Sequence, residues 1–475
     1  MPNGTRQPAA LPVLFLTEMW ERFGFYVVQG LLVLYMTQHY EYSDSKSYSI
    51  LGAFTALAYI SPIIGGKLAD RLLGFTTAVI WGGLILVLGY GLLAIPSNGI
   101  LFFPGLATII IGTGMFKPCI SSLLGEQYQK EDPRREAGFT IFYIGINMGA
   151  FISGISSGYI KDAFGWHIGF MLASIGLLIG LATFMLGLRY IKNVHTHPKI
   201  TLRTALQLIL YGLLATIGIT FLLQVSALSD WVLPGFGVLL VAYLAWLTLQ
   251  QTAVYRKSMA MLNILLLSSI VFWMMYFQMF FSVNLFISRL VDRTLFGVPL
   301  STTVFYAAES IFIITLGPLF AWSWHTLGRK NQNPETISKF ILGTFFAGLG
   351  FLILSIGTQY PSAEGLVYPI WVFLAYLLIT IGELFISPIG LSAVTMLAPP
   401  KLVGFMMGVW FVATGFGGMF AGALARIASV PDTAITTAEK LAVYHTAFLD
   451  YAGIAFFVSI ALFFSQFLVK KFILR

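Results

Sequence analysis

Apolar segments of about 20 residues or more recur along the whole chain, separated by short polar stretches. A helix needs about 20 residues to cross the hydrocarbon core of a bilayer, so each such segment predicts a membrane-spanning helix. Fourteen helices are expected, near residues 11–38, 48–69, 75–95, 101–124, 138–160, 167–189, 203–225, 232–252, 259–288, 301–325, 337–358, 366–396, 402–428 and 445–469.

Composition and charge agree with this pattern and exclude a soluble protein. The chain is 58% hydrophobic and 10% charged, whereas soluble domains have about 25% charged residues. Most of the 27 Lys and Arg residues fall in every second connection, which predicts that both termini are cytoplasmic. The net charge of +8 is therefore a loop property and does not indicate a nucleic-acid partner. The single cysteine, Cys119, excludes an internal disulfide and a cysteine metal cluster.

The connection from Gly66 to Gly74 reads GKLADRLLG and resembles the G-x-L-x-D-R-x-x-G loop of the major facilitator superfamily. That resemblance implies two six-helix bundles that move about a central site. Fourteen helices leave two extra ones. The pair after the long basic loop 190–202 fits this role, because it has no charged residue after Arg203 apart from Asp230 in its turn. We therefore expect a bundle over 1–190, a linker with an inserted helical hairpin over 191–258, and a second bundle over 259–475.

The first apolar segment carries an unusual group of polar residues. Glu18, Glu21, Arg22, Tyr26 and Gln29 follow at i, i+3, i+4, i+8 and i+11, which places them on one helix face. Charged side chains inside a membrane are costly and commonly mark a functional site. This face is therefore expected to point toward protein or a water-filled cavity.

Few other ionisable residues fall at membrane depth: Lys117, Glu309 and Glu383. Together with the first segment they make four acids against two bases. An excess of negative charge in lipid is prohibitive, so at least one acid is expected to be protonated part of the time. A proton-coupled transporter needs such a group. We find no Ser/His/Asp set, metal-ligand cluster or phosphate-binding loop at membrane depth, so an enzyme is not expected.

Two longer motifs resemble the proton-dependent oligopeptide transporter (POT) family. Glu18 to Tyr26, EMWERFGFY, is similar to its E-x-x-E-R-F-x-Y-Y motif, and Phe142 to Gly149, FYIGINMG, to its F-Y-x-x-I-N-x-G signature. Segments around Lys117, Glu383, Trp273 and Trp410 match in the expected order. The resemblance is nearest to the bacterial di- and tripeptide permeases. It implies a bacterial inner-membrane protein that works without cofactor or metal, and we expect it to act as a monomer.

The chain departs from the family pattern at five positions that bear on the substrate. Phe25 replaces a usual tyrosine, Gln29 an arginine, and Phe277 the glutamate that often pairs with that arginine. Ser310 stands where an asparagine is common. Glu309, beside it, is an acid that the family resemblance does not lead us to expect.

A di- or tripeptide is a zwitterion, and its charges need partners when they leave water. Lys117 and Arg22 are the membrane cations and so the candidates for its carboxylate. The candidates for its ammonium are Glu383, Asn147, Ser310 and Glu309. The other expected substrate-binding residues line side-chain pockets or flank them: Tyr26, Gln29, Tyr59, Tyr143, Trp273 and Trp410.

The resulting prediction is a symporter that imports di- and tripeptides with protons by alternating access, with Glu18, Glu21 and Arg22 coupling the proton. Two alternatives stay open at this point. The chain could carry another small solute with protons, such as an amine, a modified amino acid or a peptide-like compound. A fourteen-helix proton/drug antiporter fits less well, because the motifs of the first and fifth helices argue against it.

Overall fold

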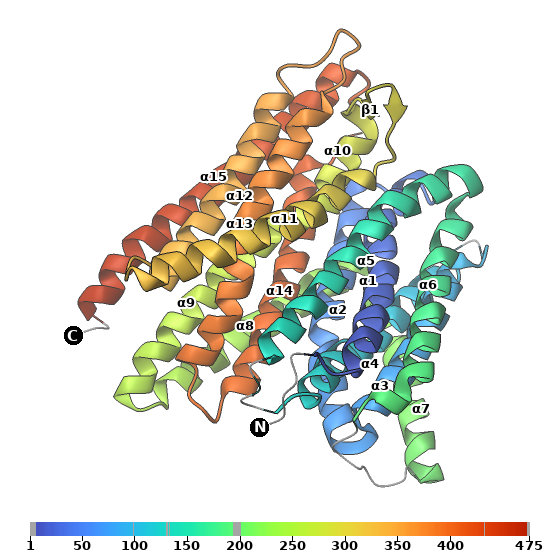
Figure 1. Cartoon of the computed structure of the whole chain (residues 1–475). Helices are drawn as coiled ribbons and strands as arrows, with labels where there is room; N and C mark the ends of the chain where they lie inside the picture. Colours follow the sequence, from blue (N-terminus) through green and yellow to red (C-terminus); the bar gives the residue numbers. More distant parts are fainter. Residues whose placement is uncertain are drawn as a thin grey trace. The chain divides into compact units, whose positions relative to one another are not determined.

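The structure of the chain is a computed structural model, and it describes residues 6–97, 99–129, 132, 134–192, 201–431 and 433–472. Nearly all of the described chain is helical (Figure 1). Much of the predicted linker lies outside the described residues.

The first half of the chain forms eight long helices. Their bounds are α1 Ala10–Gln38, α2 Asp44–Leu68, α3 Phe75–Ala94, α4 Phe102–Glu126, α5 Arg135–Phe164, α6 Trp166–Gly187, α7 Leu202–Gln224 and α8 Ser226–Leu249. Short turns extend two of them: a π-helix at Ala69–Leu73 after α2, and a 3-10 turn at Leu188–Tyr190 after α6.

The second half begins with a helix that is broken in the middle. α9, Ala253–Tyr276, is followed by a 3-10 turn at Phe277–Met279 and by α10, Ser282–Leu290. A small hairpin, β1 Thr294–Leu295 and β2 Val298–Pro299, then leads to five helices. These are α11 Val304–Arg329, α12 Thr336–Gly357, α13 Pro369–Leu397, α14 Val403–Ala425 with a 3-10 turn Arg426–Ala428, and α15 Thr437–Phe472.

Counted with α9 and α10 as one interrupted span, the described chain has the fourteen helices that the hydrophobic pattern predicts. Thirteen of these are long and apolar enough to cross a membrane by themselves. The exception is α1, whose polar face lowers its hydropathy. The chain is thus an all-α, multi-pass membrane protein.

The structure adds one detail to the prediction and corrects another. α2 ends at Leu68 and α3 begins at Phe75, close to the predicted bounds, and a π-helical turn fills much of the connection between them. Gly74 then ends the turn with a φ of 75°, a conformation that glycine adopts without strain. The predicted helix 259–288 is interrupted at Phe277, where the backbone lacks any Pro or Gly that would have indicated a break.

The backbone at the break is paired by short-range hydrogen bonds, from Phe280 N to the carbonyl of Phe277 at 2.9 Å and from Phe281 N to that of Gln278 at 3.1 Å. Backbone groups inside a membrane must find such partners within the protein. The Gln278 side chain ties the break to α14, because its Nε2 donates to the carbonyl of Ala421 at 2.9 Å, and Ser282 Oγ donates to its Oε1 at 2.6 Å.

Contacts divide the chain into two compact units. The first contains Met1–Tyr35 and Leu57–Val225, and the second contains Met36–Ala56 and Ser226–Arg475. The first helix of the expected hairpin, α7, groups with the first unit and the second, α8, with the second unit. The expected division into two bundles and an inserted hairpin stays a prediction.

In the first unit, glycines let other helices approach α1 closely. A Cβ added at Gly145 or Gly149 of α5 would meet Phe15 or the carbonyl of Met19, and one at Gly176 of α6 would meet Phe23. Small residues provide close helix packing where lipid offers no hydrophobic drive for association. The signature around Asn147 therefore supplies a contact surface for the charged helix.

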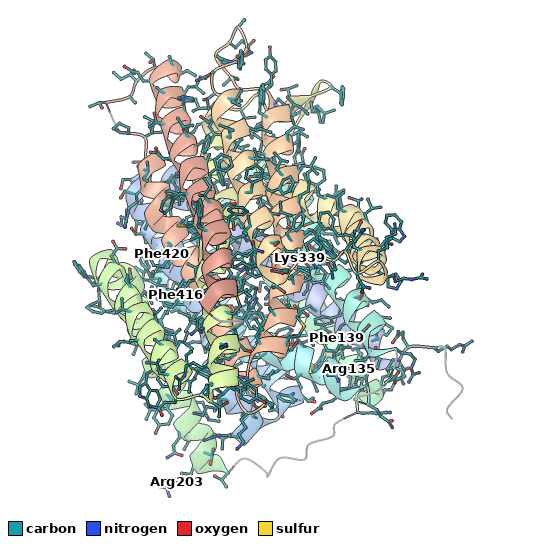
Figure 2. The ribbon with its side chains drawn as sticks, turned by 90° about the vertical axis from the view of Figure 1, so that its left-hand side faces the viewer. Arg135, Phe139, Arg203, Lys339, Phe416 and Phe420 are labelled. Carbon is teal, nitrogen blue, oxygen red and sulfur yellow. The ribbon has the colours of Figure 1, made fainter. Side chains whose placement is uncertain are left out.

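In the second unit, α12 lies beside α13 and α15, and α9 beside α14 (Figure 1). Close packing of helices at glycines recurs in this unit, because Gly343 of α12 lies against α13 and Gly382 of α13 lies against α12. Aromatic residues fill much of the remaining space. Phe416 and Phe420 lie one turn apart on α14 (Figure 2), and Phe236 of α8 stacks on Phe416 with ring centroids 6.1 Å apart.

Candidate functional site

A buried charge cluster lies on α1 in the first unit. Arg22 holds Glu21 with two hydrogen bonds, Nε to Oε2 at 2.5 Å and Nη2 to Oε1 at 2.6 Å. Its Nε also lies 3.5 Å from Glu18 Oε1. The three side chains are at most 3% exposed, and Glu18 Oε2 is buried with no hydrogen-bond partner. The predicted face therefore points into the protein, as membrane burial of charges requires.

Lys117 of α4 belongs to the same cluster. Its ammonium interacts electrostatically with Glu18, Glu21 and Arg22. Nζ lies 4.0 Å from the ring centroid of Tyr59 on α2, a cation–π contact. Two acids and two bases make this cluster neutral when all four are ionised. A further negative charge, such as a carboxylate, would then need one added proton to keep the cluster neutral.

Aromatic rings continue the cluster along α1. Phe25, 2% exposed, packs edge-to-face against Tyr26 and Tyr59 at centroid distances of 5.7 and 6.4 Å. The Arg22 guanidinium lies 4.8 Å from the Phe25 ring centroid. Gln29, one turn further, is 1% exposed. Where the resemblance leads us to expect a phenol, this chain thus presents an apolar ring that contacts Arg22.

The two predicted residues of α5 differ in their surroundings. Asn147 is buried, and its Nδ2 donates to the backbone carbonyl of Tyr143 at 3.1 Å, within its own helix. Tyr143 itself is 40% exposed in the isolated chain. Asn147 Oδ1 can still accept a hydrogen bond in this arrangement.

The second unit brings Glu309, Ser310 and Glu383 together. Glu309 of α11 and Glu383 of α13 are hydrogen-bonded to each other through their side chains. Ser310 Oγ lies 3.3 Å from Glu309 Oε2, and Tyr276 of α9 also bonds Glu309. Glu309 is 7% and Glu383 6% exposed.

The two tryptophans lie in different surroundings. Trp273 is 8% exposed, its indole Nε1 has no hydrogen-bond partner, and its ring centroid is 5.2 Å from that of Tyr276. Trp410 of α14 packs against Gly390 of α13 and lies 6.3 Å from the Phe340 ring. Trp273 therefore packs against Tyr276, whereas Trp410 contacts the packing surface of α12 and α13.

Sequence reasoning missed Tyr276. The residue lies three positions after Trp273, so helical spacing places both on one face of α9 and could have indicated it. Its contact with Glu309 could not be predicted, since it joins helices that are distant in sequence. Within the described residues, no group of three or more His, Cys, Asp or Glu side chains could hold a metal ion.

The helices and the buried charges define a class: a multi-pass membrane transporter with the major facilitator superfamily fold. The chain belongs to the POT family, because the model of that family matches residues 76–464. A curated relative, the dipeptide and tripeptide permease A of Yersinia pestis, is 34% identical over 94% of this chain and 90% of its own length.

Solved structures agree with this assignment. A mutant of a peptide transporter POT in complex with alafosfalin is 31% identical and superposes with a TM-score of 0.86, covering 99% of this chain and 96% of that chain. A protein described as tetrameric PepTSo2 is 28% identical with a TM-score of 0.85, covering 98% of this chain and 99% of that chain.

Proposed function

We propose that this chain is a proton-coupled symporter that imports di- and tripeptides by alternating access. The observation that carries the proposal is the buried cluster of Glu18, Glu21, Arg22 and Lys117, which is neutral and needs a proton when a carboxylate arrives. The peptide substrates named for the curated relatives and the solved structures support the same class of substrate.

The coupling step follows from the bidentate pair of Arg22 and Glu21. While Glu21 is ionised, both its oxygens occupy the guanidinium. A proton on Glu21 removes the charge that holds Arg22, so Arg22 becomes available for the carboxylate of the peptide. Glu18, 3.5 Å from Arg22 Nε, keeps the guanidinium in place during the exchange. Release of the proton to the inside restores the pair and expels the peptide carboxylate.

The predicted substrate-binding residues serve different parts of the peptide in this proposal. Lys117 and Arg22 take its carboxylate, and Glu383 takes its ammonium with Asn147, Ser310 and Glu309. The remaining contacts come from side chains that surround these groups: Tyr26, Gln29, Tyr59, Tyr143, Trp273 and Trp410. Charge-assisted hydrogen bonds to both ends make the zwitterion, rather than any side chain, the recognised feature.

A second solute class is favoured by one specific observation. The pair of Glu309 and Glu383 includes an acid, Glu309, that the family resemblance does not lead us to expect, beside Ser310, where an asparagine is common. An amine or a peptide-like compound with extra positive charge would suit such a place. Uptake of amines, free amino acids, dipeptides and tripeptides by the same liposomes separates the two classes.

The same proposal covers the location and the assembly of the protein. We place it in the bacterial inner membrane with both termini in the cytoplasm, acting as a monomer, with neither cofactor nor enzymatic activity. The bundles over 1–190 and 259–475 would move, and the hairpin over 191–258 would lie outside the transport pathway. Cysteine-accessibility labelling of the termini and mass measurement in native membranes test the orientation and the monomer.

The central test is pH-gradient-driven uptake into liposomes. The wild type should concentrate dialanine, whereas Glu21→Gln should bind it but not concentrate it, because the neutral amide leaves Arg22 always available and no proton controls its release. Concentrative uptake by Glu21→Gln would refute the coupling step. Lys117→Ala and Glu383→Ala should each abolish dialanine binding, and unchanged affinity in both would refute the zwitterion site.

A further inference from the structure

A buried lysine of the second unit is not neutralised by an acid. Lys339, in the first turn of α12, is 5% exposed, and its ammonium lies 4.1 Å from the ring centroid of Trp324 on α11 (Figure 2). None of the ion pairs in the described chain involves Lys339. Burying a charge without a counter-ion is costly in a protein, and more so in a membrane. The neutralising charge is therefore expected to come from outside the described chain.

The place of Lys339 in its helix adds to this cost. Backbone N–H groups give the first turn of a helix a partial positive charge, which favours an acid there and disfavours a lysine. Glu335, just before α12, does not cap the helix with its side chain, and its carboxylate accepts a hydrogen bond from Gln466 of α15 at 3.2 Å. Helical side chains lean toward the N-terminus of their helix, so the ammonium and the N–H groups of the first turn point to the same end. That end of α12 is suited to an anion.

A second donor at this place is unused. Trp324 Nε1 is buried and has no hydrogen-bond partner within the described chain. Aromatic rings border the indole: Phe320 of its own helix and Phe385 of α13, with ring centroids 5.9 and 5.5 Å from it. A buried tryptophan usually finds a partner for its N–H. An ammonium, an indole N–H and a helix N-terminus are all donors, and one anion with several oxygens would satisfy them.

The depth of these donors in the membrane selects the anion. Lys339 is three residues from the start of a helix that is long and apolar enough to span a bilayer, so it lies about 5 Å from the helix end. Lipid headgroups lie at the ends of such helices. Trp322 of α11 is 67% exposed, and tryptophan is enriched at this boundary. Arg329 and Lys330, both exposed in the connection between α11 and α12, add positive charge that favours anionic over neutral lipids.

We propose that the end of the second unit where α11 ends and α12 begins binds the phosphate group of an anionic phospholipid, held by the Lys339 ammonium, the Trp324 indole N–H and the first turn of α12. The flexible four-carbon stem of Lys339 lets the ammonium swing from the indole ring to the phosphate. Charge-assisted hydrogen bonds of this kind are the strong ones. The lipid site uses none of the residues assigned to the peptide or the proton, so its test is independent of the proposed symport.

Native mass spectrometry of the full-length protein tests the site, because the mass of an adduct distinguishes phosphatidylglycerol from inorganic phosphate. Lys339→Gln should weaken retention of one phosphatidylglycerol by about tenfold or more, the loss expected for a hydrogen bond to a charged group. Lys339→Arg should retain the lipid. The matched control Lys330→Gln removes the same charge from an exposed lysine and should weaken retention by less than about fivefold. Equal losses in Lys339→Gln and Lys330→Gln, or an adduct of inorganic phosphate alone, would overturn the proposal.

Thermal unfolding with and without lipid separates a lipid site from a purely structural contact. In lipid-free detergent, Lys339→Met should unfold at the wild-type temperature or above, because it removes a buried charge that has no counter-ion. With phosphatidylglycerol added, the wild type should become the more stable of the two, since only it gains from the bound lipid. Trp324→Phe keeps the ring and loses the donor, so it should weaken lipid retention as well. A Lys339→Met variant that is less stable than the wild type by the same amount in both media would overturn the proposal.

Discussion

The pair of Glu21 and Arg22 makes a sharp prediction about stability. In Arg22→Gln, Glu21 keeps 0% exposure and loses both of its hydrogen bonds, while Lys117 alone faces two acids. Leaving a buried charge unpaired costs about 3–5 kcal/mol. Glu21→Gln costs less, about 1–3 kcal/mol, because Glu18 still lies 3.5 Å from Arg22.

The double variant Glu21→Gln/Arg22→Gln removes one charge of each sign and leaves Glu18 with Lys117. Replacing both partners of a buried ion pair is commonly close to neutral. The double variant should therefore be more stable than Arg22→Gln alone, although it carries one more substitution. For a unit of roughly 200 residues, a difference of about 3 kcal/mol moves the unfolding midpoint by about 6–12 °C.

The chain offers its own reporter for this measurement. Cys119 is the single cysteine, is fully buried, and lies two residues after Lys117 in the same unit. A thiol-reactive dye that becomes fluorescent on coupling therefore follows unfolding in detergent. The matched control is Asp132→Asn, since Asp132 makes the same kind of pair with Arg134 at the surface, where such pairs contribute little.

The reasoning would be refuted if the losses of the two single variants simply added in the double variant. Additivity would mean that the two side chains do not depend on each other for burial. A control variant that lost as much stability as Arg22→Gln would show that the assay responds to any lost ion pair rather than to burial.

Three further outcomes follow from the contacts. Gly149→Leu should greatly reduce uptake, because its side chain would meet the carbonyl of Met19 on α1, whereas Gly212→Leu on α7 has nothing within 4 Å and should transport normally; equal activities would show that close packing on α1 is not needed. Asp44→Asn should lower the free energy of unfolding by about 1–3 kcal/mol, because the Asp44 carboxylate accepts two hydrogen bonds of 2.7 Å from Arg289 of α10, whose side chain is 30% exposed. An unchanged unfolding midpoint, followed by light scattering, would contradict this. The hydrogen bond from Arg134 lowers the pKa of Asp132 to about 2. The ionised Asp132 therefore contributes to folding stability above its unfolded pKa of about 4, and this contribution is lost only as pH falls toward 2. Asp132→Asn should therefore leave the pH profile of uptake between about pH 5 and 8 unchanged, and a shifted profile would refute this.

The local features of the fold could be predicted because they depend on neighbours in sequence. Helices follow from apolar runs, and the common face of Glu18, Glu21 and Arg22 follows from a period of 3.6 residues. The break at Phe277 could not be predicted, because no Pro or Gly in the sequence marks it. The π-helical turn after α2 likewise has no signal in its sequence.

The sequence by itself determined that the chain is a membrane transporter, that α1 carries the charges, and that acids outnumber bases at membrane depth. Only the tertiary structure decided how those charges pair. It set Lys117 beside the acids of α1 and joined Glu309 to Glu383 and Tyr276. The physical reason is that helix periodicity fixes which face a residue occupies, whereas the partner across that face depends on which helices pack together. The excess of acid visible in the sequence is thus divided in the fold between a cluster of two acids and two bases in one unit and the pair of Glu309 and Glu383 in the other.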